Sequence, residues 1–97
     1  MHIVFDKNAM KVLNEMMEEG VECFEIHDSD KEHGPMITIY PKYPEKPGPI
    51  SAYLFKSESV TDNDGVTKII LHDIPICDPL EGLLHDWKAE KRFQEAL

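Results

Sequence analysis

The run Val66-Thr67-Lys68-Ile69-Ile70-Leu71-His72 is the feature that most constrains the fold, because it is the densest run of β-branched side chains in the chain. Such residues favour extended backbone and pack well on a pleated surface. We therefore expect Val66–His72 to be the best-buried strand, in the middle of a single sheet covered by two amphipathic helices. Asp62-Asn63-Asp64-Gly65 precedes it and has turn chemistry, which predicts a hairpin with the strand Ile50–Ser57.

The N-terminal part of the chain reads as a short strand, Met1–Phe5, followed by a helix. Asp6 is suited to cap the helix, and Gly20 to end it in the left-handed conformation. Between them, apolar residues recur at spacings of three and four and predict one buried stripe. The residues of this stripe are Ala9, Met10, Leu13, Met16 and Met17.

Two further strands are predicted at Val21–His27 and Met36–Tyr40, where apolar and β-forming residues predominate. The proline-rich segment Pro41–Pro49 follows and is expected to be a surface connection, since proline cannot donate to a sheet. Asp78-Pro79 should begin a second helix, with Asp78 as cap. Its first half carries the apolar face Leu80, Leu83, Leu84 and Trp87.

The second half of that helix presents a conflict, because Ala89, Phe93 and Leu97 fall on the far side of an ideal helix from Leu84 and Trp87. Either the helix breaks near Lys88, or its second half shows a separate apolar face to another molecule. Both interpretations remain open from the sequence.

The predicted order β-α-β-β-β-β-α indicates an α+β fold with a mostly antiparallel sheet of about five strands and both helices on one face. A right-handed crossover through the first helix would make the first two strands parallel if they share the sheet. The order is similar to that of the small HesB-type carriers, which hand on iron–sulfur clusters. The chain lacks their cysteine cluster, so the resemblance implies no function.

The chain length of 97 residues predicts a single domain, 1–97. Its 19 acidic and 10 basic residues give a net charge of −9, and Arg92 is the only arginine. Phosphate binding requires clustered lysine and arginine, so direct nucleic-acid binding and contact with an acidic membrane are both disfavoured. No secretory signal or membrane-spanning run is evident, which favours the cytoplasm.

A transition-metal site is one candidate, because His72, Cys77 and His85 supply the nitrogen and sulfur ligands that such metals prefer. His72 ends a predicted strand, Cys77 lies in the following loop, and His85 lies on the next helix. The spacing matches no known zinc motif. We therefore expect no cofactor, with this metal set as the alternative.

A thiol-dependent enzyme is a second alternative, in which Cys77 would act with His72 or His85 as base. A helix N-terminus after Cys77 would lower the pKa of the thiol if it faced the first-turn amides. No oxyanion hole or glycine-rich loop is evident, so no catalytic residue is assigned.

Protein binding is the preferred function, through the acidic surface and the C-terminal helix, with self-association as a homodimer included. Tyr43 and Pro44 in the proline segment, and Phe93 and Leu97 in the tail helix, are the predicted contact residues. One version is an acidic inhibitor that imitates nucleic-acid charge. Its patch would be Glu15, Glu18, Glu19 and Glu22.

Overall fold

The computed structural model describes residues 3–42 and 48–96 and confirms the α+β class. Residues 3–6 lead into the first helix without pairing, so the described chain begins with a helix and the strand predicted at Met1–Phe5 is not among its elements. In chain order the elements are α1 (Lys7–Glu18), β1 (Val21–Asp30), β2 (Gly34–Pro41), β3 (Ile50–Tyr53), β4 (Lys56–Thr61), β5 (Thr67–His72) and α2 (Cys77–Ala96).

The strands form two sheets and not the predicted single one. β1, β2 and β3 make an antiparallel sheet, and β4 and β5 make a separate antiparallel pair. The run Val66–His72 therefore does not lie in the middle of a sheet, and all of its residues are exposed except Leu71, which is half-buried. The prediction was wrong because β-branched residues indicate only that a segment favours a strand. Burial of that strand depends on what covers its faces.

The chain leaves the first sheet at Leu54 and Phe55, which interrupt the strand predicted over Ile50–Ser57. Leu54 is fully buried, and its backbone N–H donates to the carbonyl of Pro35 at 3.0 Å. Both interactions hold this corner to β2 while the following residues turn away into β4. The sequence alternation continues through the corner, which is why it predicted one strand.

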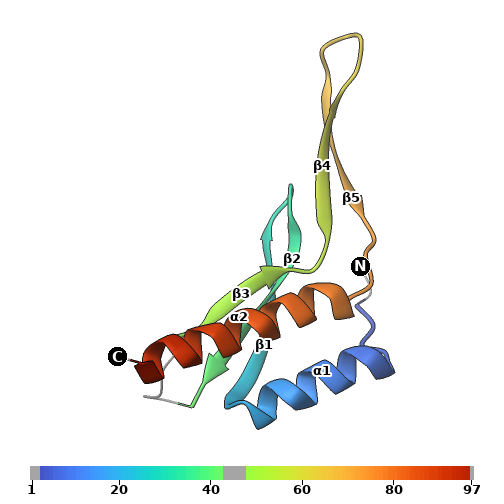
Figure 1. The fold of residues 1–97 in the computed structure, drawn as a ribbon. Coiled ribbons are helices and arrows are strands. Elements are labelled where there is room, and N and C mark those ends of the chain that lie inside the picture. The colour runs from blue at the N-terminus through green and yellow to red at the C-terminus, as the bar shows by residue number, and fades with distance from the viewer. Residues whose placement is uncertain (1–2, 43–47, 97) are drawn as a thin grey trace.

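The hydrophobic core lies between the β1–β2–β3 sheet and the two helices, which lie side by side (Figure 1). Ile37 and Ile39 of β2 are fully buried at the centre of the sheet. The predicted apolar face of α2 is confirmed, since its four residues are all buried. The core residues are Ala9, Val12, Leu13, Met16, Val21, Ile37, Ile39, Leu54, Leu80, Leu83, Leu84 and Trp87.

The buried stripe of α1 differs from the predicted one by a rotation of the helix. Val12 is buried with Ala9, Leu13 and Met16, whereas Met10 and Met17 are exposed. The spacing 9, 12, 13, 16 is the one that a single helical face requires, and it excludes positions 10 and 17.

Both predicted ends of α1 are confirmed. Asp6 Oδ1 accepts a hydrogen bond from the N–H of Ala9 at 2.8 Å, and Gly20 has a φ of 103°. The second helix begins at Cys77, so Asp78 lies in its first turn and does not cap it. It continues through Lys88 to Ala96, which excludes a break there and leaves Phe93 61% exposed.

The molecule is elongated, with extents of 53 × 32 × 18 Å and a radius of gyration of 15.9 Å. A compact chain of this length would have a radius of gyration of about 12.5 Å. The difference comes from the β4–β5 hairpin, which projects away from the helices and the first sheet (Figure 1). Within the described residues, no helix combines the length and apolarity that crossing a membrane requires.

Candidate functional site

The projecting hairpin, Lys56–His72, is the main candidate site, and we call it the arm. Its strands pair from Lys56 with His72 at the root to Thr61 with Thr67 near the tip. Asp62 shapes the tip, because its Oδ1 accepts from the N–H groups of Asp64 and Val66, both at 2.9 Å. Gly65 supplies the positive φ of the reversal, at 79°. The hairpin predicted from this turn is confirmed.

The arm has one face that carries all the ionisable side chains of its strands. Side chains directly opposite each other in an antiparallel pair lie on the same face, and alternate residues change face. His72 Nε2 lies 2.8 Å from Glu58 Oε2 on this side. The charged face consists of Lys56, Glu58, Val60, Lys68, Ile70 and His72.

The other face has no ionisable side chain. The Thr61 and Thr67 hydroxyl oxygens are 3.0 Å apart near the tip. At the root, Leu71 reaches the β1–β2 turn, where a Cβ built on Gly34 would lie 3.3 Å from Leu71 Cδ1. We call it the charge-free face, and it consists of Ser57, Ser59, Thr61, Thr67, Ile69 and Leu71.

No residue of the arm is buried, and four of its β-branched apolar side chains are exposed. The exposed fractions are between 39% and 52%, and the residues are Val60, Val66, Ile69 and Ile70. A two-stranded ribbon alone is marginally stable in water, and both of its outer edges leave backbone groups unpaired. The arm therefore leaves apolar side chains and two strand edges exposed.

The outer face of the first sheet carries a polar network that the sequence analysis missed. His27 Nε2 lies 3.0 Å from the Thr38 hydroxyl, which lies 2.7 Å from the Ser51 hydroxyl. Beside it, the Tyr40 hydroxyl donates to Glu25 at 3.1 Å, which raises the pKa of Tyr40. The period-2 pattern could have placed these residues on one face, but the partners depend on strand register. The polar groups of this network form hydrogen bonds with one another, and the network contains no reactive nucleophile.

The turn between β1 and β2 holds a second small cluster. Asp30 Oδ1 accepts from the backbone N–H of His33 at 2.7 Å, and the His33 ring lies 2.8 Å from the same oxygen. These contacts lower the pKa of Asp30, the backbone hydrogen bond having the largest effect. The His33 ring stacks on Tyr53, with ring centroids 4.7 Å apart. The cluster orders the turn and stays exposed.

The three residues of the predicted metal site lie in three different surroundings. His72 contacts Glu58 on the arm, Cys77 begins α2, and His85 contacts Asp86 on the exposed side of α2. Over 3–42 and 48–96, no group of three or more His, Cys, Asp or Glu side chains is placed to hold a metal ion. The metal hypothesis stays a prediction that elemental analysis of the purified protein tests.

The thiol of Cys77 is not activated. Its pKa is raised, first by burial and then by the negative charges of Asp78, Glu81 and Asp6. The predicted lowering by the helix N-terminus is therefore outweighed, because carboxylates surround the first turn of α2. Cys77 Sγ is 3.7 Å from Asp78 Oδ1, a contact that holds the proton on sulfur.

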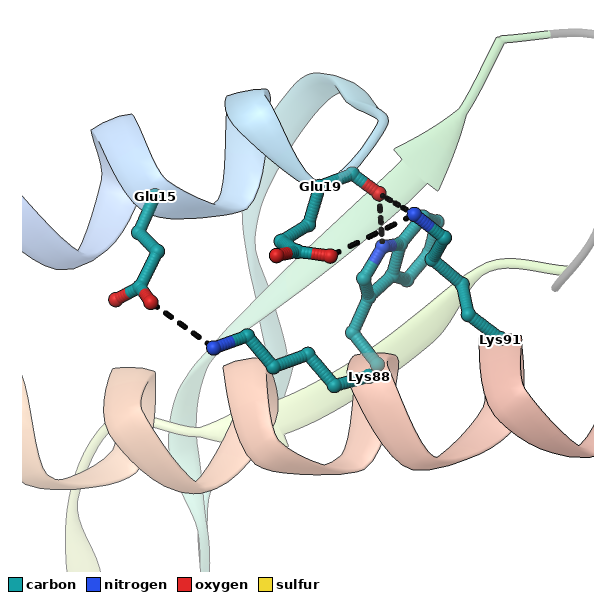
Figure 2. Close-up of polar contacts among 5 residues, drawn as sticks. Glu15, Glu19, Lys88 and Lys91 are labelled. Carbon is teal, nitrogen blue, oxygen red and sulfur yellow. Dashed lines mark hydrogen bonds and ion pairs between the residues drawn. The ribbon is translucent and has the colours of Figure 1, made fainter.

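The predicted acidic patch is partly neutralised by α2 (Figure 2). Lys88 Nζ contacts Glu15 Oε1 at 2.9 Å, and Lys91 Nζ contacts Glu19 Oε2 at 3.6 Å. Lys91 also donates to the backbone carbonyl of Glu19 at 2.8 Å, which the Trp87 indole N–H reaches at 3.0 Å. These contacts fasten α2 to the end of α1 and weaken the imitation of nucleic-acid charge.

The predicted protein-binding residues are only partly within the described structure. Tyr43, Pro44 and Leu97 lie outside the described residues, whereas Phe93 is exposed on the second half of α2. A depression of about 220 Å³ lies nearby and is polar in its lining. The residues that line it are Glu19, Lys88, Lys91, Arg92 and Glu95.

Comparison of the chain with protein-family models, curated proteins and solved structures finds no match in any of the three.

Proposed function

We propose that this chain is a non-enzymatic binding or regulatory protein that acts through protein–protein contacts, with the arm as its main contact surface. The observation that carries the proposal is the exposure of Val60, Val66, Ile69 and Ile70 on a hairpin with no core of its own. Exposed β-branched side chains on a two-stranded ribbon without a core of its own favour a surface that another molecule covers.

The backbone of the arm supports the same proposal. Within the described chain, β4 and β5 pair only with each other, so each presents a row of unpaired donors and acceptors. Proteins usually protect such edges with proline, a bulge or dense charge. The ladder from Lys56–His72 to Thr61–Thr67 has no register shift, and Lys68, the one lysine of β5, is its second residue. Strand addition is thus available to a partner.

The second half of α2 is the other contact surface that the sequence analysis predicts. Phe93 is the large apolar side chain that stands exposed there. The described apolar residues one helical turn away are alanines, Ala89 and Ala96, which add little contact area to a binding hot spot. We therefore leave Phe93 outside the proposed contact surface.

The test is affinity capture with three immobilised forms of the full chain. The wild type is compared with an arm variant (Val60→Ser, Ile69→Ser, Ile70→Ser) and a matched control (Met10→Ser, Met17→Ser, Phe93→Ser). All six residues are exposed apolar side chains. Sedimentation of each form alone measures binding of a second copy.

We expect a bound protein, or a second copy, to be lost from the arm variant and retained by the control. The proposal fails if the wild type binds neither, or if its binding survives the arm substitutions. Near-unchanged Trp87 fluorescence in both variants shows that the core is intact, because Trp87 is buried.

A further inference from the structure

We propose that the occupant of the arm is a second copy of this chain, whose own β5 pairs antiparallel with the free edge of β5. The result is a four-stranded sheet across a two-fold axis. This inference rests on the proposed binding function and names the partner.

Of the free edges of β4 and β5, the edge of β5 is the better suited to pair with another strand. β5 contains Ile69, Ile70 and Leu71 in succession, whereas β4 is mostly serine and threonine with Lys56 and Glu58. Consecutive apolar residues of high β-propensity with little charge are typical of a strand that pairs with another strand. Ladder pairing is also self-complementary, because an antiparallel copy of β5 presents matching donors and acceptors to the original.

The distribution of charge selects a second copy over a basic partner. The arm holds three of the 19 acidic residues and two of the ten basic ones, so nearly all of the −9 charge lies elsewhere. Its charge-free face offers no carboxylate to a lysine or arginine of a basic partner. A second copy paired edge to edge extends this face with another charge-free face, so neither molecule buries an unpaired charge.

The symmetry of the contact follows from the strand direction. A two-fold axis that relates two antiparallel strands of one sheet is perpendicular to that sheet. Each residue then lies beside a residue whose side chain is on the same face. The two charge-free faces then join into one surface. With the axis near Ile69, this residue lies beside its symmetry mate, and the two acidic bodies stand at opposite ends of the joined arms.

The elongated shape reduces the electrostatic repulsion between two chains that each have a net charge of −9. The arm projects from the helices and first sheet, and the molecule is 53 Å long (Figure 1). Charges separated by more than about 8 Å are largely screened at physiological ionic strength. Contact along the arms therefore avoids most of the repulsion that contact through the bodies would meet.

The experiment is sedimentation velocity over a concentration series with the full chain and two variants. Ile69→Lys places two like charges next to the two-fold axis, and Phe93→Lys makes the same change on the exposed part of α2. We expect the wild type and Phe93→Lys to dimerise with similar Kd, and Ile69→Lys to raise Kd by about tenfold or more. Trp87 fluorescence confirms that the body of each variant is folded.

Amide exchange distinguishes edge pairing from stacking of faces. In the dimer, alternate amides of β5 should exchange more slowly than in the monomer, with β4 amides unchanged. A strictly monomeric wild type overturns the inference, and so does a dimer that Phe93→Lys disrupts and Ile69→Lys does not. A dimer without slowed β5 amides overturns the edge pairing. Arm-dependent capture of another protein by a monomeric wild type would refute the second copy and leave the proposed function standing.

Discussion

The backbone carbonyl of Glu19 accepts hydrogen bonds from two side chains of α2, Trp87 and Lys91. Removing either donor leaves the other in place, so we expect Lys91→Met or Trp87→Phe to lose about 1 kcal/mol of hydrogen bonding, with a packing loss added for Trp87→Phe. The double variant leaves the carbonyl without either donor. Urea unfolding followed by circular dichroism should show that its cost exceeds the sum of the single costs. Simple additivity would show that the two bonds are independent.

Asp30 gives a pH-dependent prediction at the β1–β2 turn. Its pKa is lowered in the folded state, so its contribution to stability is complete above the ordinary carboxyl pKa and is lost as the pH falls through the lowered value. NMR titration of its carboxyl carbon should give a midpoint below that of an unstructured aspartate. A midpoint at or above the ordinary value would contradict the bonds from the His33 N–H and ring.

Cys77 should react slowly with iodoacetamide near neutral pH. Burial and then the neighbouring carboxylates raise its pKa, so less of it is thiolate than in an unstructured peptide. Asp78→Asn should accelerate the alkylation and shift its pH profile downward. Mass spectrometry separates Cys77 from Cys23 in the same sample. Alkylation faster than that of a peptide cysteine would support the thiol-dependent enzyme instead.

Among the elements, the arm and the core should differ sharply in their response to substitution. Ile37 is fully buried in β2, so we expect Ile37→Ala to cost about 2 to 4 kcal/mol. Ile70→Thr on the arm should change the stability of the body by less than about 0.5 kcal/mol in the monomer. Urea unfolding monitored by Trp87 fluorescence measures both. A large cost for Ile70→Thr would mean that the arm packs on the core.

Both helices were largely predictable from the sequence, because their signals are local. Asp6 and Gly20 mark the ends of α1 by backbone chemistry, and the buried residues of α2 follow from spacing alone. The arm was predicted as a hairpin for the same reason, since the turn at Asp62–Gly65 needs no distant partner.

The burial of the arm could not be predicted, because it depends on contacts that the local pattern does not encode. The corner at Leu54 turns the hairpin away from the sheet through a hydrogen bond to Pro35, about twenty residues earlier in the chain. The candidate site was missed for this reason. The composition of Val66–His72 predicts a core strand, and the ligand chemistry of His72, Cys77 and His85 predicts a site that the described residues do not assemble.

At the scale of the whole molecule, salt discriminates between the possible partners. Two copies of charge −9 repel each other, so added salt should tighten an arm-mediated dimer severalfold between low and physiological ionic strength. Binding of a basic protein to the acidic body should weaken over the same range. Sedimentation at several sodium chloride concentrations measures the first. A dimer that dissociates as salt is added would show that ion pairs hold it.

Because the chain leaves the body at the corner formed by Leu54 and Phe55, the length of the arm is independent of the stability of the core. Lys56 and His72 are paired at the root, so the two strands of the arm join the body at the same place. Removing two residues from each strand would keep the alternation of faces and shorten the hairpin by about 7 Å. Length can thus vary in steps of two residues per strand. In the proposed dimer this length would set the spacing between the two bodies without altering the core of either one.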